Sequence, residues 1–308
     1  MALVPEPVIE GFTVGIAVII AISQLKDLLG LSTVKASADL IEALPALWAA
    51  REAINPTALA IGIFAVAGIA LLRRIVPWFP GSLLVVAGAS AAVAVLLLPV
   101  DTIQSRFGAL PLGWPSPSLP RISVARISEL LPSAFVIAFL AAVESLLSAI
   151  VADRMIGSRH RSNAELIAQG AANIASPLFG GLPATGAIAR TATNVRAGGR
   201  TPIAGIVHAL TILLVTLGAG WLAGYLAMPA LAGLLIVTAW IMSEPARWRE
   251  RMRLRPGDRT LFFMTMILTV ASDLTIAIAV GTVAGLGLRL ARRDVEPAEW
   301  TPSDRSKL

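Results

Sequence analysis

Residues 134–150, AFVIAFLAAVESLLSAI, form an apolar block that carries one charged side chain, Glu144. The block approaches the roughly 20 residues with which an α-helix crosses the hydrocarbon core of a bilayer. An ionisable side chain at that depth costs several kcal/mol unless it faces a cavity, an ion or a partner. The block therefore predicts a membrane-spanning helix that carries a candidate functional site.

The whole chain has the composition of a membrane protein. Of its 308 residues, 56% are hydrophobic and 14% are charged, and the mean hydropathy is +0.79. A soluble domain contains about 25% charged residues and could not bury so much apolar surface in one core. Further blocks that are nearly free of charge lie at 14–22, 58–72, 83–98, 206–226, 231–242 and 261–270. We therefore predict an all-α, polytopic membrane protein.

The sequence lacks the residues of several other functional classes. It contains no cysteine, and its two histidines, His160 and His208, cannot form a multi-histidine metal centre. No nucleophile–base pair or phosphate-binding loop is visible, so we expect no enzyme, no cofactor and no metal site. The net charge of +6 comes from arginines between apolar blocks, which indicates membrane orientation rather than binding of nucleic acid.

About ten hydrophobic helices are expected, and some of them are too short to span a bilayer alone. Their limits are 7–27, 57–75, 80–98, 128–152, 164–179, 184–197, 202–226, 228–243, 259–272 and 274–293. Long polar connections cover 28–55 and 99–127, and the first is expected to hold a short amphipathic helix at Asp39–Ala50. Ser162 and Asn163 are candidate caps for the helix that begins nearby.

The arginines provide an independent test of this topology. They gather in five clusters: Arg73 and Arg74; Arg154, Arg159 and Arg161; Arg196 and Arg200; the arginines between 247 and 259; and Arg289, Arg292 and Arg293. With the helices given above, all five clusters fall on one side. The positive-inside rule places that side and the C-terminus in the cytoplasm. We therefore expect a multi-pass protein of the cell (inner) membrane. Residues 294–308 are expected to be disordered.

The segment from Phe179 to Arg190, FGGLPATGAIAR, places helix-breaking residues at membrane depth. Irregular backbone is tolerated there only where it lines a cavity or is buried in protein. A short helix that starts near Thr185 to Ala187 could hold an anion at its N-terminus, with Arg190 adding a full positive charge. The alternative is a glycine-rich packing hinge whose arginine extends to the interface.

Glu144 and Ser148 lie one helical turn apart on the same face. A carboxylate with a hydroxyl group beside it suits a hard cation or a proton, so both residues are candidates for ion coupling. The alternative is a carboxyl group that is protonated or paired with a structural arginine. Gln169 and Asn173 are expected to form hydrogen bonds between helices, at modest gain.

Residues 143–210, which run from VESLLSAIVADRM to TPIAGIVHAL and include the broken segment, closely resemble the sulfate permease family of anion transporters, the SulP group. Two further stretches agree, PVIEGFTVGIAVIIAISQLKDLLGL at 7–31 and LTVASDLTIAIAVG at 268–281. The resemblance covers about residues 5–293.

The resemblance implies two inverted repeats of seven transmembrane helices, a fold like that of uracil permeases. Residues 1–127 would supply gate helices of the first repeat with extracellular loops, 128–226 core helices of the second repeat with the anion site, and 227–293 its gate helices. The family's first four helices and its STAS domain have no counterpart here. We therefore expect a partial fold of about ten helices, including a broken half-helix, that does not transport by itself.

The resemblance also implies the site. The family's anion-facing backbone and its arginine correspond to Gly186, Ala187, Ile188, Ala189 and Arg190, beside which Thr185 offers a hydroxyl group. Glu144 falls where sodium-coupled members carry aspartate, and Ser148 where they often carry a hydroxyl. The glutamate favours a proton over sodium, because a desolvated carboxyl group binds protons more readily.

The expected function is secondary active transport of a small inorganic anion of the sulfate or bicarbonate class, coupled to a proton, as a fragment of the full transporter. The expected partners are the lipid bilayer, the anion, a coupling proton or sodium ion and, for the full-length form, a second copy. One alternative is a truncated, non-transporting membrane remnant. Another is a nucleobase permease of the same fold, which would need carboxylates in the broken segment to form hydrogen bonds with a base, whereas this segment offers Arg190. The sequence leaves the anion and the choice between symport and exchange open.

Overall fold

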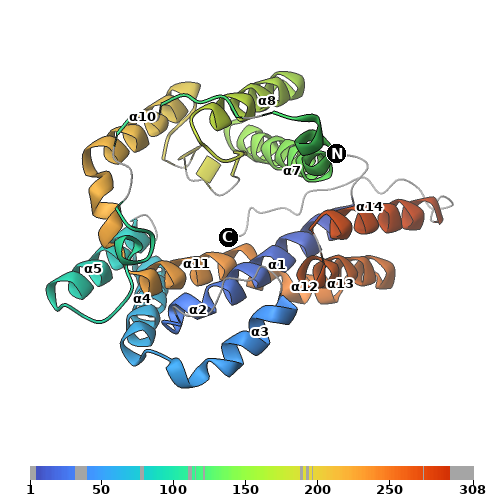
Figure 1. Cartoon of the computed structure of the whole chain (residues 1–308). Coiled ribbons are helices and arrows are strands. Elements are labelled where there is room, and N and C mark those ends of the chain that lie inside the picture. The colour runs from blue at the N-terminus through green and yellow to red at the C-terminus, as the bar shows by residue number, and fades with distance from the viewer. Residues whose placement is uncertain are drawn as a thin grey trace. The chain divides into compact units, whose positions relative to one another are not determined.

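The computed structural model describes residues 5–31, 40–76, 80–109, 113–114, 116–120, 122–187, 190–191, 194–195, 197–272 and 274–291. Within this part of the chain the regular structure is helical (Figure 1), apart from an isolated β-bridge between Thr102 and Ala227. The predicted all-α class is therefore confirmed. The predicted disordered tail, 294–308, lies outside the described residues.

The chain divides into two compact units. The first comprises residues 1–26, 33–53 and 235–308, and the second comprises 27–32 and 54–234. The first holds α1 (Glu6–Ser23), α3 (Leu40–Ala49), η1 (Arg51–Ala53), η3 (Pro245–Arg247), α12 (Trp248–Met252), α13 (Pro256–Ala271) and α14 (Leu274–Ala291). The second holds α4 (Pro56–Ile75), α5 (Gly81–Val95), α6 (Ile103–Phe107), α7 (Val124–Ile156), α8 (Ser162–Leu178), α10 (Pro202–Ala219) and η2 (Gly220–Tyr225). Two helices contain residues of both units, α2 (Leu25–Leu28) and α11 (Met228–Met242).

Most predicted helices agree with the observed ones to within a few residues, and α3 matches the predicted amphipathic helix. The short α6 was not predicted; it begins with a capping box of Thr102 and Ser105. The predicted caps of α8 are wrong. Ser162 and Asn163 lie in its first turn, and the Ser162 hydroxyl lies 3.0 Å from Nε2 of His160. The Ser162 hydroxyl therefore interacts with the His160 ring instead of capping the backbone N–H groups of α8.

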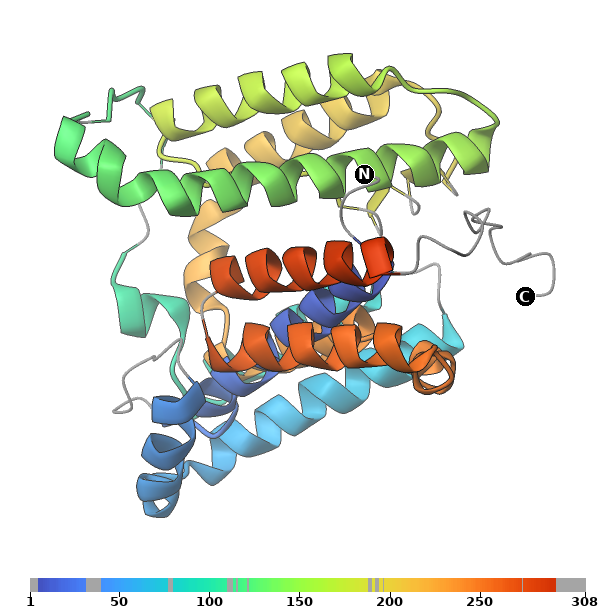
Figure 2. The same cartoon turned by 90° about the vertical axis from the view of Figure 1, so that its right-hand side faces the viewer.

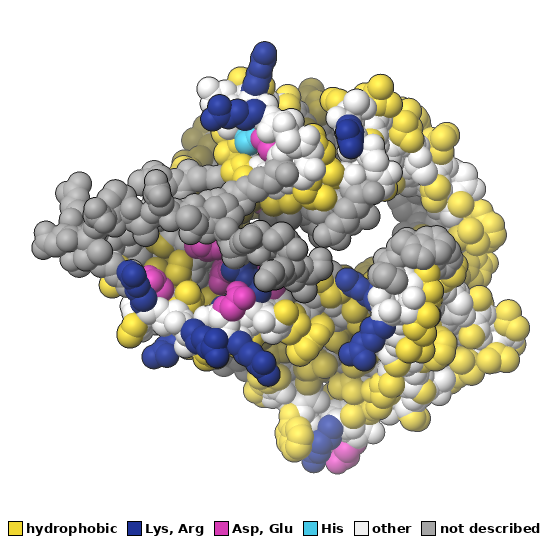
Figure 3. Space-filling model, turned by 180° about the vertical axis from the view of Figure 1, so that it is seen from behind, with side chains coloured by type: hydrophobic (Ala, Val, Ile, Leu, Met, Phe, Trp, Pro, Cys, Tyr) yellow, Lys and Arg dark blue, Asp and Glu magenta, His cyan; other side chains and the backbone are white. Residues whose placement is uncertain are grey.

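Within the described residues, five helical stretches are long and apolar enough to cross a membrane. They are Glu6–Leu28, Pro56–Ile75, Val124–Asp153, Pro202–Tyr225 and Met228–Met252. Large apolar side chains on these stretches are exposed, among them Phe64, Phe135, Leu214 and Trp240. Figure 3 shows hydrophobic side chains spread over much of the surface visible from that side. Such extensive apolar exposure suits lipid rather than water as the surrounding medium.

In the first unit, α1 packs against α13 and α14, and its backbone lies very close to that of α13. A Cβ atom added to Gly11 would overlap the carbonyl oxygen of Phe262, and one added to Gly15 would lie 2.6 Å from Cβ of Thr269. Phe262 and Thr269 are fully buried. Small residues permit this close approach of the helices. Close packing matters in a bilayer, because the hydrophobic effect does not drive helices together in lipid.

A partly buried ion-pair cluster also lies in the first unit. Glu10 on α1 pairs with Arg247 at 2.7 Å and with Arg251 at 3.3 Å. The Arg251 side chain is 4% exposed and lies over the rings of Trp248 and Phe262, at 5.9 and 5.5 Å from their centroids. Sequence reasoning treated Arg251 as a loop arginine that reports orientation, whereas the structure gives it a packing role.

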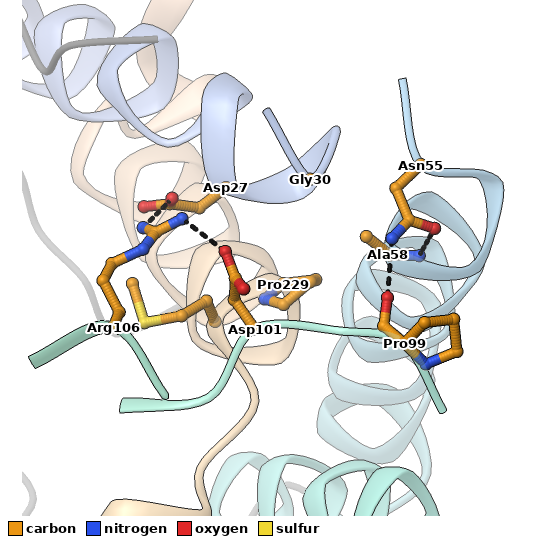
Figure 4. Close-up of a pocket in the computed structure, with 9 residues that line it drawn as sticks. Asp27, Gly30, Asn55, Ala58, Pro99, Asp101, Arg106 and Pro229 are labelled. Carbon is orange, nitrogen blue, oxygen red and sulfur yellow. Dashed lines mark hydrogen bonds and ion pairs between the residues drawn. The ribbon is translucent and has the colours of Figure 1, made fainter. Parts of the chain in front are cut away.

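In the second unit, Arg106 lies between two carboxylates beside a cavity of about 80 Å³ (Figure 4). Arg106 forms ion pairs with Asp27 and, at 3.1 Å, with Asp101. Across the cavity, the Asn55 side chain donates to the carbonyl of Pro99 at 2.7 Å. Together these contacts join the end of α2, the start of α4 and the connection between α5 and α6.

Candidate anion-binding site

The predicted break in the chain follows α8. Gly180 has φ of +70°, in the left-handed region that glycine tolerates best. The N–H of Gly181 donates to the carbonyl of Ser176 at 2.9 Å, and a Cβ atom on Gly181 would overlap the Ser176 hydroxyl. Residues 181–187 are then non-helical. The glycine pair therefore ends the helix in the way the sequence indicated.

A helix resumes close to the predicted position. Arg190 and Thr191 are helical, and the N–H of Thr191 donates to the carbonyl of Ala187 at 2.9 Å. Arg190 is exposed and lies in the first turn. A helix that starts here directs unpaired N–H groups and a positive dipole end toward its N-terminal side. Two predicted site residues, Ile188 and Ala189, lie outside the described residues.

The backbone of the broken segment is held by polar side chains of α8, which runs beside α7 (Figures 1 and 2). Asn173 donates from Nδ2 to the Ala184 carbonyl at 2.9 Å and accepts the Ala184 N–H on Oδ1 at 2.7 Å. Gln169 donates from Nε2 to the same carbonyl. The hydroxyl of Ser176 donates to the Leu182 carbonyl at 2.8 Å.

Helix α7 holds the next two residues. The N–H of Gly186 donates to Oγ of Ser145 at 3.1 Å, and Ser145 donates to Oε1 of Gln169 at 3.0 Å. The hydroxyl of Thr185 donates to the Ala141 carbonyl at 3.0 Å. Sequence reasoning missed Ser145, although a serine beside Glu144 in an apolar helix was a visible signal. The donor groups of Thr185 and Gly186, which we predicted to face an anion, are engaged with α7.

Glu144 and Ser148 have different surroundings in the structure. Glu144 is exposed on α7, in the electrostatic field of Arg190. Ser148 is 4% exposed, and its Oγ lies 2.6 Å from Oγ1 of Thr191. Its hydroxyl therefore joins α7 to the resumed helix. Among the described residues, no group of three or more His, Cys, Asp or Glu side chains could hold a metal ion.

These features can be compared with known proteins. The sequence profile of the sulfate permease family matches residues 1–265. The chain belongs to this family. It is 40% identical over 283 residues to the putative sulfate transporter YvdB of Bacillus subtilis, with 91% of this chain and 53% of the relative covered. It is 30% identical over 296 residues to the bicarbonate transporter BicA of Picosynechococcus, with 95% and 51% covered.

Two solved structures are similar as well. The transmembrane domain of a cyanobacterial BicA aligns with a TM-score of 0.76 at 28% identity, covering 93% of this chain and 70% of that one. Murine Slc26a9 in its inward-facing state aligns with a TM-score of 0.82 at 20% identity, covering 94% and 48%. The family and the fold class predicted from the resemblance over residues 5–293 are confirmed. The chain spans about half the length of the curated relatives it matches.

Proposed function

We propose that this chain takes part in secondary active transport of a small inorganic anion of the sulfate or bicarbonate class. The observation that carries the proposal is the break after α8, followed by a helix with Arg190 in its first turn. A helix N-terminus and a guanidinium group together suit an anion better than a neutral nucleobase. The names of the two relatives support sulfate and bicarbonate as candidates.

In the proposed site, the anion lies at the start of the resumed helix, lined by Ala187, Ile188, Ala189 and Arg190. Thr185 and Gly186 adjoin it, and their hydrogen bonds to α7 support a role in fixing the backbone. Residues 128–226 would then form the mobile core, and 1–127 and 227–293 the gates. The five arginine clusters support a multi-pass protein of the cell (inner) membrane with a cytoplasmic C-terminus, and the full-length form would be a homodimer.

Uptake of labelled sulfate and bicarbonate into proteoliposomes tests this proposal. The chain is reconstituted alone and together with the part of the Bacillus subtilis relative that the match does not cover. We expect uptake with that part present and none with the chain alone. Binding without uptake in both preparations would favour the non-transporting alternative. Uptake of labelled uracil in place of the anions would favour the nucleobase alternative.

Glu144 is the proposed carrier of the coupling proton. Ser148, on the same helix, would join α7 to the anion site through Thr191. The Glu144 carboxylate is exposed within a membrane-spanning stretch and lies in the field of Arg190. In the uptake assay, Glu144→Gln is expected to abolish the acceleration of uptake by an inward proton gradient, because an amide cannot gain or lose the proton. Glu129→Gln, an exposed glutamate on the same helix, is the matched control. Unchanged proton-driven uptake by Glu144→Gln would contradict this role.

A further inference from the structure

One face of α8 is polar and turned inward, while two of its large apolar side chains, Ile167 and Ile174, are strongly exposed. Gln169, Asn173 and Ser176 follow one another at spacings of four and three residues, so they share a face, and all three are half-buried. Ile167 and Ile174 are 74% and 75% exposed. In water this arrangement would be inverted. In a bilayer it places the polar groups where they can serve the backbone of the broken segment.

The polar face of α8 forms hydrogen bonds with backbone groups of the broken segment, which have no partners in a helix of their own. Asn173 pairs with both the N–H and the carbonyl of Ala184, as a neighbouring β-strand would. Gln169 reaches the same carbonyl. Without such partners, each of these backbone groups would be an unpaired polar group at membrane depth. The side chains therefore favour one position of Ala184 along α8 over any shifted position.

The same hydrogen bonds continue to α7. Gln169 accepts from Ser145, and Ser145 accepts the N–H of Gly186. A Cβ atom on Gly186 would lie 3.2 Å from Cα of Ser145, so the segment also lies very close to the backbone of α7. Ala184 and Gly186 are thus fixed from two helices.

We propose that Asn173 and Gln169 are positioning residues of the anion site, which act through Ala184 and Gly186 to set where the helix that carries Arg190 begins. This inference rests on the proposed function. Each residue of an α-helix turns it by about 100° and advances it by about 1.5 Å. A slip of one residue in the broken segment would therefore turn the Arg190 side chain to a different side of the helix.

A role limited to joining α7 and α8 predicts a different result. Polar contacts between membrane helices contribute modestly to stability, so losing them would loosen the two helices without moving Arg190. Anion affinity measured on the folded protein would then be unchanged. Affinity, together with the exchange of the amides of the broken segment, separates the two roles.

The test uses the 308-residue chain in lipid nanodiscs, as wild type, Asn173→Ala and Gln169→Ala. Asn163→Ala is the matched control, because Asn163 is an exposed asparagine on the same helix. Binding of labelled sulfate is measured alongside amide hydrogen exchange over residues 182–187. We expect both site variants to bind about tenfold more weakly, since the backbone groups of Ala184 would lose partners that favour the native arrangement. Their Ala184 and Gly186 amides should exchange faster, while the control matches wild type in both measurements.

The outcomes are distinct. Wild-type affinity in folded Asn173→Ala and Gln169→Ala overturns the inference, and so does weaker binding with unchanged amide exchange. If Asn173→Ala does not fold, Gln169→Ala decides. If wild type shows no saturable sulfate binding, the proposed function fails; faster amide exchange in the variants would then show only that Asn173 and Gln169 hold the broken segment in place.

Discussion

Arg190→Gln is expected to weaken sulfate binding by roughly 10- to 100-fold, because a hydrogen bond to a charged group contributes about 1.5–3 kcal/mol and each 1.4 kcal/mol is about tenfold in affinity. In the proposed site, the guanidinium and the helix N-terminus act on the same anion. Equilibrium binding of labelled sulfate to the chain in nanodiscs measures the change.

Two further variants make this result specific. Arg200→Gln removes an exposed arginine later in the same region and should bind sulfate as wild type does. Arg190→Lys keeps the charge without the planar pair of donors and should be intermediate. Wild-type affinity in Arg190→Gln would instead support the packing hinge, with Arg190 extending to the interface.

Gly11→Ala is expected to cause the largest loss of stability among single methyl additions in the first unit. The new Cβ atom would overlap the backbone carbonyl of Phe262, which is completely buried and has no room to move aside. Overpacking of a filled core typically costs about 1–3 kcal/mol, and a clash with backbone belongs at the upper end. Reversible unfolding in detergent, followed by circular dichroism, measures the difference in free energy of unfolding.

Gly287→Ala is the matched control for this substitution. Gly287 lies on α14 in the same unit, is exposed, and has nothing within 4 Å of an added Cβ atom. Alanine favours a helix by about 1 kcal/mol over glycine, so this variant should match or exceed wild type in stability. If both alanine variants behaved alike, the close approach of α1 to α13 would be wrong.

Hydropathy and helix-breaking residues predicted much of the fold. The apolar blocks located the helices to within a few residues, because a bilayer demands long apolar segments. Gly180, Gly181 and Pro183 predicted the break, and Arg190 lies near the start of the resumed helix as expected. These features depend on residues that are close together in the sequence, so a single sequence is enough to predict them.

The tertiary hydrogen bonds could not be predicted from the sequence. Ser145 bonds to Gln169 across 24 residues and to Gly186 across 41, and Arg251 bonds to Glu10 across 241. No local pattern specifies such partners. For the same reason the sequence suggested that Thr185 and Gly186 donate to an anion, whereas their donor groups bond to α7. A polar residue in a membrane helix indicates that a partner exists, but the packing of the helices decides which one.

The central claim is that the break and the helix that follows it bind an inorganic anion. Equilibrium binding of labelled sulfate to the wild-type chain in nanodiscs, with unlabelled bicarbonate, chloride and uracil as competitors, tests it most directly. We predict saturable binding of sulfate that at least one of the two anions displaces and uracil does not. Absence of saturable anion binding, or displacement by uracil alone, would contradict the account.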